Sequence, residues 1–188
     1  MVYISRMKVK IPLLFVFIFL ININFFAAEY LWTGASSTFF EDAGNWTIGG
    51  VVTSEKPDSD DNITIPDVSG ASNRFPVIRL TESANDVTIN SGATLTINSS
   101  NNFTVSGTFD ASAGSLTFTS SANLILNGAI SSGGLGSFTE STSTVTYGSS
   151  SAQNVDADNY YNLIISGNAT KTAQGSVNVA GTMTVQSG

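Results

Sequence analysis

The chain contains 188 residues, of which 11% are charged, and it has neither cysteine nor histidine. Without these residues there is no disulfide, no thiolate nucleophile, no imidazole base and no Ser-His-Asp triad. The formal net charge of −7 would repel phosphate backbones, which argues against nucleic acid as a partner. The composition therefore points to an architecture and a destination rather than to a catalytic centre.

The first segment, residues 1–28, has the composition of an export signal. Three basic residues precede an apolar run over 11–26, and two small residues, Ala27 and Ala28, stand before the first acidic residue, Glu29. The run is shorter than the ~20 residues that cross a bilayer comfortably. We therefore predict a signal peptide helix that meets the secretion machinery and is removed before Glu29. An uncleaved anchor is the alternative.

Cleavage at this point would leave an acidic and cysteine-free chain. Four basic and fourteen acidic residues would remain, which gives a net charge of −10. We expect an exported protein that is extracellular or at the outer surface of a bacterium. Because such a destination is oxidising and the chain has no disulfides, packing and backbone pairing must supply its stability.

A short unit recurs after the signal: an apolar residue, then Thr or Asn, then a second apolar residue, with Gly, Ser and Asn on either side. It occupies residues 63–65, 87–89, 95–97, 103–105, 116–118, 145–147, 177–179 and 183–185. Alternation with a period of two is typical of strands. No sustained helical spacing is present. We therefore expect an all-β fold with almost no helix after the signal.

A longer period relates these units to one another. Phe103, Leu124 and Val145 follow one another at a constant interval. The same interval separates Leu95 from Leu116 and Phe109 from Ile130. Further on it becomes less regular, because the step from Leu163 to Met183 is one residue shorter and the step from Val155 to Val177 is one residue longer.

This period predicts a three-sided parallel β-solenoid, with about 21 residues and three strands in each coil. The solenoid would occupy residues 86–188. A single coil buries too little apolar surface to offset the entropy of ordering its backbone, so the coils must stack. We expect Thr and Asn to form polar ladders on the outer faces, with corner Asn side chains bonded between adjacent coils.

Residues 29–85 lack the regular period, contain both tryptophans and are predicted to form an N-terminal cap with the first strands. A cap is needed because a solenoid exposes an unpaired edge and an open apolar layer at its ends. Four aromatic side chains are candidates for covering that layer: Trp32, Phe39, Phe40 and Trp46. No such segment follows 183–185, so we expect the chain to be the N-terminal part of a longer protein.

Several short motifs follow one another in order along the chain. They are Trp32-Thr33-Gly34, Asn45-Trp46, Asp60 to Pro66, Pro76-Val77-Ile78, Val87-Thr88-Ile89, Ser91 to Ile97 and Tyr161 to Gly167. This order resembles the N-terminal region of large secreted, repeat-rich surface proteins of Bacteroidetes-like bacteria. The resemblance implies an adhesin-like stalk or passenger that a dedicated secretion system delivers. It carries no catalytic residue, because none of the matching positions is catalytic.

Three carboxylates place oxygen atoms at closely spaced positions, as a calcium loop would: Asp58, Asp60 and Asp61. The glycine and the distant glutamate of an EF-hand loop are absent. An ordinary turn that Pro57 introduces is the other interpretation. We therefore assign no metal and no cofactor to the chain.

Paired carboxylates are the only remaining acid–base groups, and β-solenoids do include polysaccharide lyases and glycosidases. The candidates in the repeat region are Asp110, Glu140, Asp156 and Asp158. Their surroundings indicate corners and solvated loops. Only four basic residues stand after the signal: Lys56, Arg74, Arg79 and Lys171. We therefore assign no catalytic residue and predict that the protein is not an enzyme.

Exposed aromatic side chains could stack on sugar rings, and the candidates are Tyr160, Tyr161 and the two tryptophans. The alternative is that alternate members point into the core. Four sequons begin at Asn45, Asn62, Asn102 and Asn168, but a Ser- and Thr-rich sequence contains such triplets by chance.

Two functional hypotheses remain. The first is a structural or adhesin-like solenoid that extends from the cell and makes weak, multivalent contacts with surface polysaccharide or with host or matrix glycans. The second is the N-terminal part of a carbohydrate-active β-helix enzyme, a lyase or glycosidase, whose catalytic residues lie outside this sequence.

Overall fold

The computed structural model describes residues 27–98 and 100–186. The predicted signal helix therefore lies, apart from its last two residues, outside the described part. That part consists of short strands and one 3-10 turn, η1 (Ala43–Asn45). Within it, no helix has the length and hydrophobicity to cross a membrane. The expectation of an all-β chain is confirmed.

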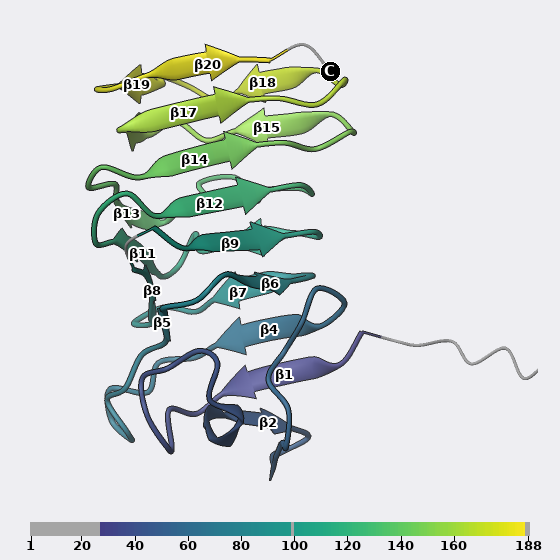
Figure 1. The fold of residues 1–188 in the computed structure, drawn as a ribbon, viewed down its shortest axis with the longest axis vertical. Helices are drawn as coiled ribbons and strands as arrows, with labels where there is room; N and C mark the ends of the chain where they lie inside the picture. The colour runs from purple at the N-terminus through teal and green to yellow at the C-terminus, as the bar shows by residue number, and fades with distance from the viewer. Residues whose placement is uncertain (1–26, 99, 187–188) are drawn as a thin grey trace, which may run out of the picture.

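The strands stack as rungs along one long axis (Figure 1). Sheet C has the order β20-β17-β14-β12-β9-β6, where the strands are β6 (Glu82–Ala84), β9 (Asn102–Val105), β12 (Asn123–Leu126), β14 (Thr144–Tyr147), β17 (Asn162–Ile165) and β20 (Met183–Val185). Sheet B has the order β13-β11-β8-β5, where the strands are β5 (Val77–Ile78), β8 (Thr94–Ile97), β11 (Ser115–Phe118) and β13 (Ser137–Thr139).

The third side is divided. Sheet A has the order β10-β7-β4-β1-β2-β3, where the strands are β1 (Glu29–Trp32), β2 (Trp46–Ile48), β3 (Val51–Val52), β4 (Asn62–Ile65), β7 (Val87–Ile89) and β10 (Phe109–Asp110). Sheet D continues this side in the last coils and pairs β15 (Gln153–Val155) with β18 (Lys171–Ala173), whereas sheet E lies on the side of sheet B and pairs β16 (Asn159–Tyr160) with β19 (Asn178–Val179).

The strand register confirms the predicted period. Leu124 pairs with Phe103 on one side and with Val145 on the other, all in parallel strands. The equal intervals from Leu95 to Leu116 and from Phe109 to Ile130 join strand partners as well. The chain is therefore a three-sided parallel β-solenoid, in which each strand of sheet C begins a new rung.

One predicted interval is wrong. Val155 pairs with Ala173, which stands earlier in the chain than the expected partner, Val177. The step from Val145 to its partner Leu163 has the same length as the step from Val155 to Ala173, and both are shorter than the regular period. The coil after β14 has shorter corners than the coils before it. Apolar residues recur so often in this chain that Val177 matched the expected period by coincidence, whereas backbone pairing selects the shorter coil.

Alternation along each strand fills the interior. In β12, Leu124 and Leu126 are fully buried and Ile125 faces outward. From β8 onward the outer row of sheet B is made of hydroxyl side chains, as predicted: Thr96, Thr117 and Thr139, whereas the first strand, β5, places Val77 in this row. The outer row of sheet C alternates between Thr and Ile instead: Thr104, Ile125, Thr146, Ile164 and Thr184. The ladder prediction therefore holds for most of one of these faces and for only part of the other.

Asparagine side chains connect adjacent coils, as expected. Asn123 Nδ2 donates to Asn102 Oδ1 at 2.7 Å, and Asn178 Nδ2 donates to Asn159 Oδ1 at 3.0 Å. These two bonds join strand partners and so repeat the parallel register at the side-chain level. Asn85 Nδ2 also donates to Asn62 Oδ1, at 2.8 Å, although Asn85 stands just before the residue in register with Asn62.

The N-terminal end is closed by a change of strand direction. The first strand, β1, pairs in parallel with β4, but β2 and β3 continue the sheet in antiparallel orientation. Gly49 and Gly50 connect them with positive φ angles of 58° and 82°, which a two-residue hairpin turn requires. The hairpin therefore ends the parallel stacking of sheet A at this end.

Aromatic side chains fill the space inside this end. Trp32, Phe40 and Trp46 are fully buried, and Phe40 meets Phe103 of the coils edge-on at 5.7 Å between ring centroids. Phe39 was expected to join them, but it is 37% exposed and lies beneath the Arg79 guanidinium. Three of the four predicted plugging residues therefore have that role.

Candidate functional site

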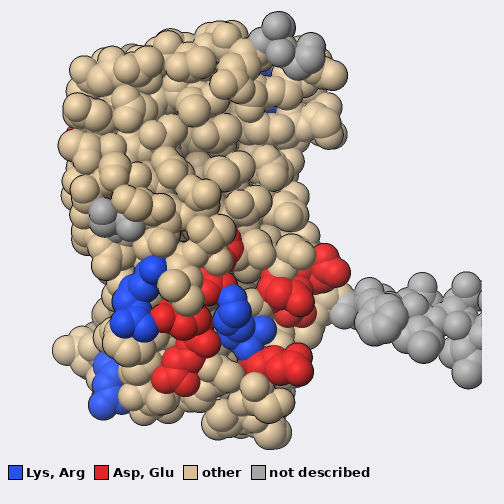
Figure 2. Space-filling model, viewed as in Figure 1, with Lys and Arg blue, Asp and Glu red and all other residues tan. Residues whose placement is uncertain are grey.

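Charged residues are concentrated at the N-terminal end of the solenoid. Of the fourteen acidic residues, ten precede residue 87, and Lys171 is the only basic residue after it. On the face in Figure 2, blue and red atoms gather over the first coils and the hairpin, whereas the surface over the later coils is almost uncharged. An uncharged outer surface favours contacts through hydroxyl and amide groups.

Two polar side chains at this charged end form an ion pair at β6, the edge strand of sheet C. Glu82 begins β6 and points inward, where the following rungs carry Phe103 and Leu124. Its carboxylate is buried and forms an ion pair with Lys56, which comes from the segment between β3 and β4. An inward charge on an edge strand discourages pairing with other chains. This pair is therefore a structural one.

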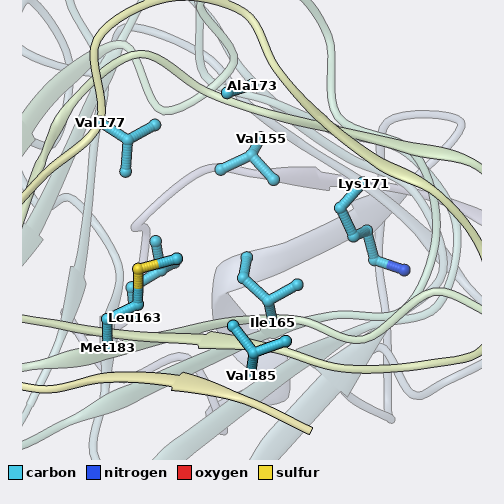
Figure 3. A pocket seen from close by; sticks show the side chains of 8 residues that line it. All are labelled: Val155, Leu163, Ile165, Lys171, Ala173, Val177, Met183 and Val185. Atoms are coloured by element: carbon cyan, nitrogen blue, oxygen red, sulfur yellow. The ribbon is translucent and has the colours of Figure 1, made fainter. Parts of the chain in front are cut away.

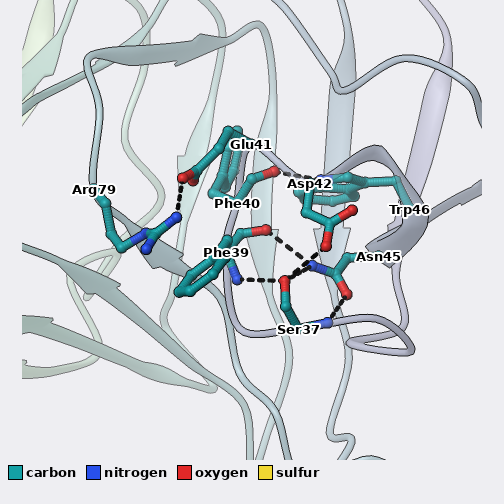
Figure 4. A network of polar contacts seen from close by, with 8 residues as sticks. All are labelled: Ser37, Phe39, Phe40, Glu41, Asp42, Asn45, Trp46 and Arg79. Carbon is teal, nitrogen blue, oxygen red and sulfur yellow. Dashed lines mark hydrogen bonds and ion pairs between the residues drawn. The ribbon is translucent and has the colours of Figure 1, made fainter.

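A second polar network organises the turn around η1 (Figure 4). The Asn45 amide is buried, accepts from the backbone N–H groups of Ser36 and Ser37, and donates to Phe39 O. Asp42 accepts from Ser37 Oγ and from the N–H of Gly44, and hydrogen bonds from neighbouring serines hold the pKa of this carboxyl below its usual value. The network is internal, and the sequon that begins at Asn45 is inaccessible.

The three candidate calcium ligands organise their own turn. Asp58 Oδ1 accepts from Asp60 N at 2.9 Å, and Asp61 Oδ2 accepts from Asp58 N at 3.0 Å. In the part of the chain that the structure describes, no group of three or more acidic, His or Cys side chains is placed to hold a metal ion. The turn interpretation accounts for these hydrogen bonds.

The main irregularity of the solenoid lies between β14 and β17. Sheet B ends at β13, and β15 and β16 start new sheets instead of stacking on the previous coil in register. Side chains add hydrogen bonds here: Gln153 Nε2 donates to Gly128 O at 2.7 Å and to Leu126 O at 2.9 Å, which also accepts from Gly148 N. We call this region, residues 126–160, the coil break.

Asp156 has the matching role on the other side of the coil break. Its two carboxylate oxygens accept from the backbone N–H groups of Gly133 and Leu135, each at 3.0 Å. Asp156 is buried, so its carboxylate replaces a strand that would otherwise satisfy these donors. One of the four carboxylates considered for catalysis is therefore a structural group.

Two buried tyrosines complete the coil break. The Tyr147 and Tyr160 hydroxyls lie 2.8 Å apart. Tyr160 donates to Asp156 O at 2.9 Å, so the shared proton belongs to Tyr147, which accepts from Asp156 N at 3.2 Å. Burial raises the pKa of both tyrosines. The neutral hydroxyls thus form a closed chain with one backbone amide and one carbonyl.

The structure brings three of the four candidate carboxylates into one neighbourhood. Burial raises the pKa of Asp158, with further contributions from the charges of Asp156 and Glu140. Asp110 lies apart on sheet A, where Ser112 N and Oγ donate to it and its pKa is lowered, chiefly by the Ser112 side chain. Sequence reasoning therefore named Glu140 and Asp158 as candidates but could not pair them.

A groove of about 450 Å³ opens beside Glu140. We call it the corner groove, and it is lined by Glu140, Asn159, Tyr160, Val177, Asn178, Val179 and Ala180. It lies where β16 and β19 occupy the side that sheet B occupied in earlier coils. The two asparagines were not among the predicted site residues, although the interval between them fits the shorter coils and could have indicated that they are neighbours.

The aromatic candidates for sugar stacking differ in their exposure to solvent. Trp32, Trp46 and Tyr160 are buried, as the alternative interpretation requires, and Tyr161 is 36% exposed. Tyr161 stands at the corner between β16 and β17, directly after Tyr160 of the groove lining. It is therefore the one aromatic group among those four candidates that a ligand could reach.

The opposite end of the solenoid from the hairpin exposes its interior. Figure 3 shows apolar side chains from sheets C and D facing one another there. They line an apolar cavity of about 230 Å³: Val155, Leu163, Ile165, Ala173, Val177, Met183 and Val185, with the stem of Lys171. Met183 and Val185 are 56% and 70% exposed, although their positions in β20 continue the inward rows of sheet C.

Comparison with known proteins gives a family without an assigned activity. The model of a domain of unknown function, DUF8693, matches residues 31–164, which is most of the described solenoid. No curated protein and no solved structure matches the chain.

Proposed function

We propose a non-enzymatic structural role for this chain, which belongs to the DUF8693 family: an adhesin-like solenoid that is exported and extends from the outer surface of a bacterium. The observation that carries the proposal is the continuous parallel register along sheet C, from β6 to β20. Stacking of this kind produces a stiff rod whose length grows with the number of coils. A rod of this kind is suited to extension and display.

The outer surface supports contacts that are weak and repeated. Hydroxyl groups recur on sheet B and asparagine amides recur at corners, at the spacing of adjacent strands. Each group offers a hydrogen bond of modest net strength, and a polymer that meets many of them gains avidity. Surface polysaccharide or host and matrix glycans are the proposed partners.

The exposed apolar end supports the proposal that these coils begin a longer rod. The edge of β20 and the cavity beside Met183 present the same layer that every earlier coil covers with its successor. An uncovered layer of this kind promotes aggregation unless another element packs on it. Further coils would cover it, just as the hairpin closes the other end.

Export is proposed from the sequence of residues 1–28 and from the resemblance to secreted bacterial surface proteins. Mass spectrometry of the protein recovered from a Gram-negative host that expresses the full chain tests it. We expect a mature N-terminus at Glu29 and a protein that antibodies label on intact cells or detect in the medium. Intact residues 1–28 on a chain that stays in the cytoplasm would refute export.

The carbohydrate-active enzyme is the competing proposal, and the meeting of Glu140 with Asp158 near a groove is the observation in its favour. Incubation of the purified full chain with laminarin, xylan and polygalacturonate distinguishes the two. We expect no release of reducing ends or unsaturated products. Release that Glu140→Gln abolishes would replace the structural proposal with the enzymatic one.

A further inference from the structure

We infer that the corner groove is a binding site for a neutral polysaccharide, with Tyr161 as a stacking platform at its rim. The inference rests on the proposed function for the class of partner, and it deepens that proposal by naming one site and by excluding acidic sugars. Four features support it: the shape of the coil break, the free polar groups of the groove, the position of Tyr161 and the local charge.

The groove is a consequence of the coil break. Up to β13 the second side of the solenoid is a regular sheet, and its next rung is the two-residue strand β16. Only β19 stacks on β16, and only two residue pairs connect them. A shorter rung above a longer one leaves a hollow at the corner, and Glu140 lies at its lower side directly after β13.

Free hydrogen-bonding groups converge on this hollow. Among the described residues, no partner is found for the Glu140 carboxylate. The bond from Asn178 Nδ2 to Asn159 Oδ1 leaves Asn178 Oδ1 as an acceptor and Asn159 Nδ2 as a donor. A carboxylate beside paired amides matches the vicinal hydroxyls of a sugar, which donate and accept at neighbouring positions.

Tyr161 supplies the apolar face that a sugar ring also needs. A Cβ added at Gly181 would lie 3.1 Å from Tyr161 Cε1, so the ring lies against the backbone of the next coil. That contact limits the motion of the ring while 36% of the residue remains exposed. Val177 and Val179 add apolar surface inside the groove. Rigid aromatic groups present contact area with little loss of side-chain entropy.

Local charge selects among sugars. Glu140 and Asp156 lie close enough to Asp158 for their charges to act on it, and none of the described residues that line the groove is basic. A uronic acid or a sulfated sugar would bring a further negative charge to this site and would be repelled. A neutral chain has hydroxyl donors for the carboxylates and meets no such repulsion.

Affinity electrophoresis of the full chain in native gels tests the inference. The gels contain laminarin, xylan or glucomannan as neutral probes, and polygalacturonate as the acidic probe. We expect retardation by at least one neutral polymer and none by polygalacturonate. Tyr161→Ala and Glu140→Ala should each weaken that retardation by about tenfold, the effect of losing one good contact. Tyr161→Phe should retain it, because the ring remains.

Thr88→Ala, on the exposed face of sheet A, is the matched control and should bind as the unmodified chain does. Circular dichroism checks that every variant keeps its strand content. Absence of retardation in all three neutral gels would overturn the inference, as would equal binding of polygalacturonate or full binding by both alanine variants. Those results would leave export standing, because the N-terminal mass and cell-surface labelling measure it separately.

Discussion

Single side chains hold the solenoid together where its backbone pairing is interrupted. Asp156 and Gln153 bond to four backbone groups of the preceding coil, and both are buried. A buried amide or carbonyl without a partner is destabilising. The hydrogen bonds of these two side chains therefore stabilise the fold here, as strand pairing does in the regular coils. The shorter coil is possible because two polar residues compensate for the bonds that it loses.

Replacing Asp156 tests this compensation. Asp156→Ala would remove the acceptor of the buried Leu135 N–H and of the more exposed Gly133 N–H, and we expect the free energy of unfolding to fall by about 1–3 kcal/mol. Asn154→Ala, two residues away on the exposed side of β15, should change it by less than about 0.5 kcal/mol. Urea unfolding followed by circular dichroism measures both. Equal effects would show that the Asp156 bonds are dispensable.

Asp158 should act in the opposite direction. Its raised pKa means that the folded chain binds a proton there more readily than the unfolded chain, so the ionised form destabilises the fold. This destabilisation is present at neutral pH and disappears as the pH falls through the folded-state pKa. Asp158→Asn, which retains the oxygen that accepts from Asn159 N, should raise the melting temperature at pH 7 and not at pH 3.

Thermal melts across that pH range check the prediction. A variant that melts at the same temperature as the unmodified chain at pH 7 would contradict it. Asp110→Asn is a useful comparison because the pKa of Asp110 is lowered by its hydrogen bonds from Ser112. Its ionised form stabilises the fold above the unfolded pKa, so this substitution should lower the melting temperature at pH 7 and have less effect in acid.

Among the elements, corners decide how closely coils approach. Gly136 and Gly133 flank a corner of the same coil, with φ angles of 64° and 66°. A Cβ at Gly136 would lie 1.9 Å from Ala111 O in the coil below, whereas a Cβ at Gly133 would meet nothing within 4 Å. The two glycines share one backbone conformation and differ in the space around them.

This pair separates conformational strain from coil contact. Gly133→Ala should destabilise the chain by about 1 kcal/mol, because of the positive φ alone. Gly136→Ala should destabilise it by about 2–4 kcal/mol more, since the backbone beneath must move. Denaturant unfolding of the two variants gives the difference directly. Equal effects would mean that the coils have room to separate at this corner.

Along the full length of the rod, the two ends differ. The hairpin and buried aromatics close the N-terminal end, and the last coil leaves Met183 and Val185 uncovered. Each coil of a solenoid is stabilised mainly by its neighbours, so a coil with one neighbour should be the least stable. Stability should therefore decrease along the rod from its centre toward β20.

Hydrogen exchange measured by mass spectrometry tests this gradient. We expect the slowest exchange in β9 and β12, intermediate exchange in β14, and exchange at least about tenfold faster in β18, β19 and β20. The hairpin end should be more protected than the β20 end, because β1 has strand neighbours on both sides. Uniform protection along the rod would contradict nearest-neighbour stabilisation.

The regular coils were predictable because apolar residues recur along the sequence at a constant interval. Phe103, Leu124 and Val145 mark equivalent positions, and alternation around each shows which residues face inward. Val155 shows the limit of this reasoning: Val177 fitted the period, but the short corners of the following coils bring Ala173 opposite Val155 instead. Phe39 shows the same limit, since an aromatic residue beside Phe40 fits either side of the cap and the prediction that it is buried was wrong.

Local sequence and composition were sufficient to predict the strand type, the period of the coils, the inward residues and the acidic N-terminal end, because each of these depends on neighbours in the chain. The three-dimensional arrangement was needed to show where the period breaks, that Asp156 is a structural group, and that Glu140, Asn159 and Asn178 line one groove. Such meetings depend on the length of every corner between them, and a small change of length in one coil alters all the contacts above it.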